Sequence, residues 1–176
     1  TYYVYGDTEG TDGVRADVAD IEDEMVRSAI SRAASGFDEG NLRSETFYDL
    51  TGEKGEERNA YTYNYRSNGT EVRNTTVYTY EVTGDREIQR MTQTDTYKGQ
   101  VADIDNITEE HQSTTYYYLD DQVTGVIEKG DEIADYMRDH KTGRDTYYFY
   151  GDTAGTDGVR ADVADIEDEM VRSAIS

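Results

Sequence analysis

A long stretch at the start of the chain, residues 1–31, recurs as residues 146–176. Only two positions differ between the copies, Val4/Phe149 and Glu9/Ala154. A match of this quality is not chance, and an offset of 145 residues is the length of a whole domain rather than of a solenoid repeat. We therefore expect a single repeat unit at residues 1–145, followed by a partial second copy at residues 146–176.

Three explanations of this duplication remain open. The chain can be one unit and a fraction of a natural tandem array, cut within a longer repeat. It can also be an engineered duplication, in which two copies of a segment compete for one docking site as an alternate-frame or domain-swap switch. In the third explanation the folding unit is offset from the sequence repeat, so that the terminal segment of one chain completes the domain of a neighbour.

The charge of the chain excludes some classes of partner. With 39 acidic and 17 basic residues the formal net charge is -22, so we expect neither nucleic-acid binding nor direct membrane insertion. Low Lys content relative to Arg, with abundant Asp, Glu and Thr, resembles the composition of proteins from extreme halophiles, especially haloarchaea. Salt shortens the range of carboxylate repulsion, from about 10 Å at 0.1 M to about 3 Å at 1 M. The alternative is an ordinary acidic mesophilic protein.

The repeated segment reads as a strand, a polar loop and a long helix. Tyr2–Tyr5 is typical of a strand, and a Gly-rich loop at residues 6–13 follows it. Apolar residues then recur at helical spacing through residues 14–30, which predicts an amphipathic helix. These residues are Val14, Val18, Ile21, Met25 and Ala29. The same helix is expected at residues 159–175.

Between the two copies the apolar and aromatic residues mostly alternate. The alternation predicts an antiparallel meander with strands near residues 46–50, 61–65, 78–82, 86–97, 116–119 and 123–127. Residues 98–112 are less regular and predict a long loop or a short helix. A short amphipathic helix is expected from Gly130, with Ile133, Ala134 and Met137 on its inner face. The predicted class is therefore α+β, with one long and one short helix packed on the meander.

Tyrosine carries much of the predicted core and of the predicted assembly surface. The chain has 17 Tyr, and Tyr61, Tyr63, Tyr65, Tyr78 and Tyr80 fall on one sheet face. These rings are expected to pack as core; an uncovered face would instead suit a sugar, a lipid or a partner strand. The opening strand and its copy predict assembly residues Tyr2, Tyr3, Tyr5, Tyr147, Tyr148 and Tyr150.

Two oxygen-rich segments are candidates for calcium, which prefers six to eight oxygen ligands. One is the loop with Asp7 and Asp12, where turn formation and helix capping are the alternative. The other holds Asp103, Asp105 and Glu109, where a solvated acidic loop is the alternative. No other cofactor is expected.

Three sequons for N-linked glycosylation lie in the sheet half, at Asn68, Asn74 and Asn106. They favour an extracellular or cell-surface glycoprotein. A chance origin of these short motifs is the alternative reading.

Catalytic chemistry has little support in the sequence. There is no Cys, and the only histidines are His111 and His140, so thiolate and multi-histidine sites are excluded. His140 stands beside Asp139 and near Asp145, which permits an acid–base pair, but no nucleophile lies at an interpretable spacing. We predict that the chain is not an enzyme.

These observations predict a structural or assembly protein. It would be one unit of an extracellular tandem-repeat array or filament, in which strand exchange through the duplicated segment links successive units and leads to self-association. A surface binding module on the Tyr-lined face and an engineered duplicated segment are the alternatives.

Overall fold

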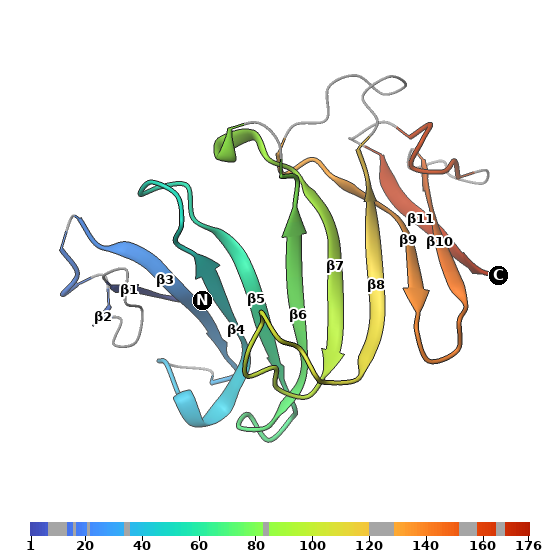
Figure 1. Ribbon diagram of the computed structural model, residues 1–176. Helices are drawn as coiled ribbons and strands as arrows, with labels where there is room; N and C mark the ends of the chain where they lie inside the picture. Colours follow the sequence, from blue (N-terminus) through green and yellow to red (C-terminus); the bar gives the residue numbers. More distant parts are fainter. Residues whose placement is uncertain are drawn as a thin grey trace. The chain divides into compact units, whose positions relative to one another are not determined.

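The structure is a computed structural model that describes residues 1–6, 14–15, 17–20, 22–33, 36–82, 85–119, 129–151, 158–164 and 168–176. Its eleven strands are antiparallel, and their order in the sheet is β11-β10-β9-β8-β7-β6-β5-β4-β3-β1-β2 (Figure 1). Two short 3₁₀ turns, η1 (Glu39–Asn41) and η2 (Arg86–Ile88), are the only helical elements in the described part of the chain. The predicted α+β class is therefore wrong, and the fold is all-β.

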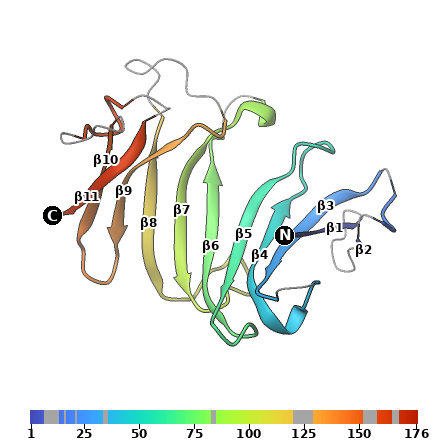
Figure 2. The same ribbon diagram turned by 180° about the vertical axis from the view of Figure 1, so that it is seen from behind.

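The chain divides into two compact units. Unit 1 comprises residues 1–77 and 97–110, and unit 2 comprises residues 78–96 and 111–176. Unit 1 contains β1 (Tyr2–Gly6), β2 (Val14–Arg15), β3 (Glu24–Ser31), β4 (Leu42–Asp49) and β5 (Arg58–Tyr65). Unit 2 contains β8 (His111–Tyr118), β9 (Ile133–Asp139), β10 (Asp145–Gly151) and β11 (Glu169–Ile175), while β6 (Val72–Tyr80) and β7 (Met91–Lys98) contribute residues to both (Figure 2).

The long helix predicted at residues 14–30 is instead the short strand β2 and the strand β3. The spacing of the buried residues explains the error. Val26 and Ala29 are both buried although they stand three residues apart, a spacing that also occurs on one helix face. In β3 this spacing arises from a bulge, because Val4 pairs with Arg27 and Tyr5 with Met25, which leaves Val26 as the extra residue.

The other predicted helices fail for a related reason. In the second copy, residues 169–175 form β11, and Val171 is again the extra residue opposite β10. The expected short helix at Ile133, Ala134 and Met137 is β9, where the register against β8 shifts so that Asp135 is the extra residue. Each bulge changes the two-residue period of a strand into a spacing that resembles a helix.

The strands expected from uninterrupted alternation are present. Residues 46–50, 61–65 and 78–82 overlap β4, β5 and β6, and residues 116–119 overlap β8. Residues 86–97 divide into η2 and β7, and residues 99–110 connect β7 with β8. The strand predicted at 123–127 lies outside the described residues.

The core of unit 1 lies between β4–β6 and the segment that follows β7. Val101 is fully buried, and the Tyr63 hydroxyl donates a hydrogen bond of 2.7 Å to its carbonyl oxygen. Thr75, also fully buried, accepts a hydrogen bond from the Val101 amide and donates one to the Gly99 carbonyl. Tyr63 therefore packs as core, as its place in the alternation predicts.

The core of unit 2 is built from the second copy of the repeat. Buried Tyr150, Ala161 and Ala164 pack together, with Tyr118, Ile133 and Tyr148 around them. The Tyr150 hydroxyl donates to the Ala134 carbonyl at 2.6 Å. Burial raises the pKa of Tyr150 to about 12.

Candidate functional site

The two copies of the repeat fold into the same β-hairpin. In unit 1 Tyr2 pairs with Ala29, and in unit 2 Tyr147 pairs with Ala174, at the offset of the sequence repeat. The bulge also recurs at the equivalent valine. We call the β1–β3 pair hairpin 1 and the β10–β11 pair hairpin 2.

A cation–π contact is common to both hairpins. The Arg15 guanidinium lies 4.6 Å from the ring centre of Tyr2, and Arg160 lies 4.3 Å from that of Tyr147. The contact joins the first strand of the hairpin to the segment between its two strands. The two copies of the repeat therefore share this contact as well as the strand pairing.

Hairpin 1 is held on its β3 side by β4. Arg27 Nη1 lies 2.5 Å from Oε1 of Glu45, and the hydroxyl groups of Ser28 and Tyr48 are 2.9 Å apart. Glu45 is only 6% exposed and also accepts a hydrogen bond from the Tyr65 hydroxyl at 2.5 Å. Burial, and then the hydrogen bond to Glu45, raise the pKa of Tyr65 well above its ordinary value.

Hairpin 2 is held on its β10 side by β9. Tyr147 pairs with Tyr136, and the two ring centres are 5.8 Å apart. Arg160 forms an ion pair with Asp135 of β9. In unit 1 the short strand β2 pairs with Val4 and Tyr5 of β1, and the Tyr2 ring contacts Phe37 at a centre distance of 4.6 Å.

Strand β11 is the outermost strand of hairpin 2. Its side chains are largely exposed, including Met170 at 51% and Ile175 at 69%, whereas the equivalent Met25 in β3 is partly buried. Arg172, the equivalent of Arg27, has its guanidinium 4.2 Å from the ring centre of Phe149. Val4 stands at the Phe149 position in hairpin 1, so one of the two differences between the copies lies beneath this arginine.

The two hairpins thus have nearly the same sequence but contact neighbouring strands along different edges. Hairpin 1 has the contacts to β4, and hairpin 2 has the contacts to β9. The predicted assembly tyrosines Tyr2, Tyr3 and Tyr5 lie in β1, and Tyr147, Tyr148 and Tyr150 lie in β10. The ion pairs Arg27–Glu45 and Asp135–Arg160 were not predicted, because each joins segments that are separated in the sequence.

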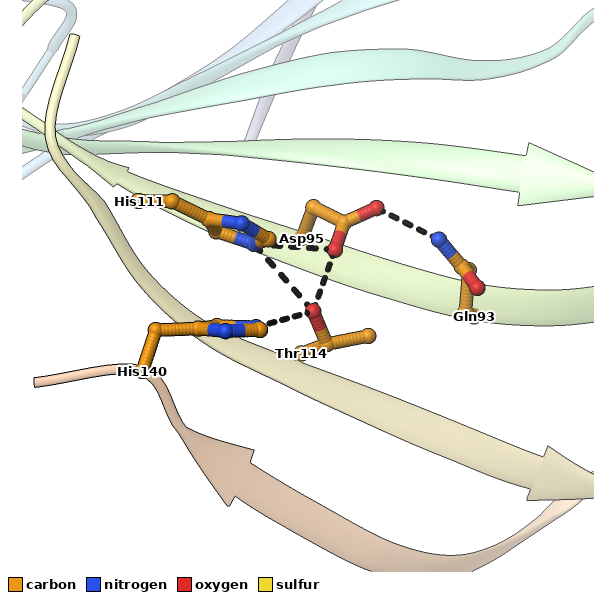
Figure 3. Close-up of polar contacts among 5 residues, drawn as sticks. All are labelled: Gln93, Asp95, His111, Thr114 and His140. Carbon is orange, nitrogen blue, oxygen red and sulfur yellow. Dashed lines mark hydrogen bonds and ion pairs between the residues drawn. The ribbon is translucent and has the colours of Figure 1, made fainter. Parts of the chain in front are cut away.

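A second polar cluster lies in unit 2, around Thr114 (Figure 3). Thr114 is 2% exposed, and its hydroxyl donates to Oδ1 of Asp95 at 2.5 Å. Nε2 of His111 is 3.0 Å from the same carboxylate oxygen, and Nε2 of His140 is 2.9 Å from the Thr114 hydroxyl. Gln93 donates to the other Asp95 oxygen at 2.7 Å.

The contacts of this cluster differ from those of a nucleophilic triad. The same nitrogen of His111 faces both Asp95 and Thr114, whereas a nucleophilic triad uses the two ring nitrogens for its two partners. Thr114 is also buried. The His111 and His140 rings stack with centres 3.9 Å apart. His140 therefore contacts Thr114 and His111, whereas the sequence permitted an acid–base pair with Asp139 or Asp145.

The predicted calcium ligands occupy two places. Asp7 and Asp12 lie outside the described residues. Asp103 and Glu109 accept hydrogen bonds from the nearby amides of Asp105 and Thr108. Among the residues that the structure describes, no group of three or more His, Asp or Glu side chains is placed to hold a metal ion.

The three sequons differ in their surroundings. Asn68 and Asn106 are exposed, and Oδ1 of Asn68 accepts hydrogen bonds from the Thr70 and Glu71 amides. Asn74 is partly buried in β6, where its Oδ1 atom has no hydrogen-bond partner. Asn68 and Asn106 are therefore the accessible acceptors.

Comparison of the chain with protein-family models, curated proteins and solved structures finds no match. Within the described part of the chain, no helix has the length and hydrophobicity needed to cross a membrane.

Proposed function

We propose that this chain is a structural repeat unit in which the duplicated hairpin joins one unit to the next. In a tandem array, each internal hairpin would use both flanks at once. Its first strand would pair with β9 of the preceding unit, and its second strand would pair with β4 of its own unit. Consecutive units would then be linked by a rigid sheet junction rather than by a flexible linker.

The proposal rests on one observation: two strands with the same sequence have different contacts. The residues of β3 and β11 are the same, yet β3 pairs with β4 through Arg27 and Glu45, whereas β11 is largely exposed. An exposed outer strand with unpaired backbone groups is a ready template for another strand. Its natural partner is a strand with the sequence of β4.

The surface of such an array would be acidic and external. The net charge of -22 suits a protein kept soluble in concentrated salt. Asn68 and Asn106 would carry glycans at the cell surface or outside the cell. The array or filament is thus proposed as an extracellular structural element of a halophilic organism.

The proposal is tested by extending the chain after Ser176 with residues 32–145, which continues the repeat. Ser173→Cys is combined with a Thr→Cys change at the added position equivalent to Thr46. In unit 1 Ser28 and Thr46 stand opposite each other, and opposite positions in neighbouring strands are close enough for a disulfide. The chain has no native Cys, so an intramolecular disulfide reports this pairing.

The matched control combines Ser173→Cys with Thr46→Cys in the first unit, where β3 already occupies the flank of β4. We expect an intramolecular disulfide in the test chain and none in the control. Absence of the disulfide from the test chain, or equal yields in both chains, would contradict a shared hairpin.

A further inference from the structure

The same identity between β3 and β11 has a consequence for separate molecules. We propose that a second copy of this chain binds along β4, with its β11 in the place of β3. This inference extends the proposed junction from one polypeptide to two. The binding surface is the flank of β4 that Arg27, Ser28 and Ala29 occupy in the closed molecule.

The incoming strand carries the equivalents of the two β3 residues whose side chains contact Glu45 and Tyr48, whereas the hydrogen bond from Arg32 to the Leu42 carbonyl lies outside the repeated segment. Arg172 reaches Glu45 as Arg27 does, and Ser173 reaches Tyr48 as Ser28 does. Glu45 is the main determinant of recognition, because its buried carboxylate needs a cation and a hydrogen-bond donor. The exchange therefore keeps the side-chain interactions of Glu45 and Tyr48 in β4.

The donor molecule loses little when it binds. Hairpin 2 keeps its own β9 contacts, including the Arg160–Asp135 pair and the Tyr150 hydrogen bond, while its β11 engages the acceptor. Arg172 gives up its place over Phe149, an exposed cation–π contact. The acceptor loses more interactions, because its own hairpin 1 must leave β4.

The resulting association is heterologous. The donor uses β11 and the acceptor uses β4, so an acceptor still has its own β11 free to enter a further molecule. Heterologous contacts that do not close into a ring produce open chains. Because each molecule carries a large negative charge, association should increase with salt.

Three charge-reversal variants separate exchange from unspecific aggregation. Arg27→Glu places a carboxylate against buried Glu45 and expels hairpin 1, while Arg172 stays available. Arg172→Glu disables only the donor and leaves the closed molecule intact. The double variant disables both hairpins.

Light scattering during size exclusion, at molar salt, measures the outcome. We expect the apparent mass of Arg27→Glu to double at least, while Arg172→Glu and the double variant keep the mass of one chain. If Arg27→Glu stays monomeric, or if the double variant associates as strongly, the inference is overturned.

A second experiment does not depend on the stability of a charge variant. A Ser173→Cys chain is mixed under mild oxidation with a Thr46→Cys chain, and in a parallel mixture with a Thr70→Cys chain. Thr70 is exposed and takes no part in the β3–β4 pairing, so its heterodimer gives the collisional background. We expect more heterodimer with Cys at position 46 than at position 70, and the reverse order overturns the inference.

The experiments can reject the junction within one polypeptide and the exchange between molecules independently of each other. A disulfide in the extended chain together with monomeric Arg27→Glu would retain the junction within one polypeptide and reject exchange between molecules. Exchange in the mixed chains without a disulfide in the extended chain would reject the junction.

Discussion

Arg27 and Arg172 occupy the same place in two copies of one hairpin, yet their guanidinium groups have different partners. Arg27 pairs with the buried Glu45 of β4 at 2.5 Å, and Arg172 lies over the Phe149 ring at 4.2 Å. Two differences accompany these contacts, because β4 supplies Glu45 to Arg27, and Phe149 supplies to Arg172 a ring that Val4 does not provide in hairpin 1. The duplicated segment is therefore a module whose environment differs between the two units.

The Arg27–Glu45 pair should be asymmetric in its effect on stability. Arg27→Met leaves Glu45 buried without its cation, so we expect a loss of about 3 kcal/mol in the free energy of unfolding. Glu45→Gln should cost less, about 1–2 kcal/mol, because the Arg27 side chain is 31% exposed and the amide can still accept from Tyr65. Urea unfolding of dilute protein measures both values.

Arg172→Met is the matched control, since its side chain has no buried partner carboxylate in the described structure. Its effect should stay within about 0.5 kcal/mol. Equal losses for Arg27→Met and Arg172→Met would show that the Glu45 contact does not distinguish the hairpins.

The Thr114 cluster should depend on the threonine hydroxyl. Thr114→Val removes the donor to Asp95 and the acceptor for His140, and leaves the buried Asp95 carboxylate without this hydrogen bond. We expect a loss of about 1–3 kcal/mol in unfolding free energy. Thr115→Val, one residue along on the opposite face of β8, is the control, and a comparable loss there would argue against a specific network.

The turn at Gly69 should not tolerate a side chain. Its φ of +75° favours glycine, and an added Cβ would lie 2.5 Å from the Cα atom of Asn41. Gly69→Ala should therefore lower the thermal midpoint strongly. Gly55 has a φ of +93° but open space around it, so Gly55→Ala should cost only about 1 kcal/mol. Similar midpoints for the two variants would contradict this packing.

Alkaline pH should destabilise both units through buried tyrosines. Burial, followed by the proximity of Tyr63, raises the pKa of Tyr61 to about 12, and burial does the same for Tyr150. The folded state thus holds these protons more tightly than the unfolded chain, whose tyrosines have a pKa of about 10. Their contribution to stability is complete below pH 10 and is lost as the pH rises toward 12.

Tyrosinate absorbance, recorded as the pH rises, measures this effect. Tyr61→Phe and Tyr150→Phe should each remove a late-titrating group. Early titration of Tyr61 and Tyr150 would contradict their burial.

The parts of the fold that sequence predicts well are those with an unbroken two-residue period. Tyr61, Tyr63 and Tyr65 alternate without interruption, and β5 is found where that pattern places it. In β3, β9 and β11 a bulge shifts the phase, so that Val26 and Ala29 reproduce a helical spacing. A bulge is defined by pairing with another strand, and a single sequence does not display that pairing.

The candidate site was also predicted only in part from the sequence. The near-identity of residues 1–31 and 146–176 is visible in the sequence and defines the duplicated segment on which the proposal rests. Its recognition partner Glu45 was not predicted, because an acidic residue in so acidic a chain has no distinguishing signal until the Arg27 pairing buries it.

Hydrogen exchange of the β11 amides tests the shared hairpin most directly. Among the described residues β3 is paired on both sides, whereas β11 is paired only with β10, so residues 169–175 should exchange faster than residues 24–30. When residues 32–145 are added after Ser176, the account predicts that β11 becomes as protected as β3. Unchanged exchange of β11 in the extended chain, with the added segment folded, would contradict it.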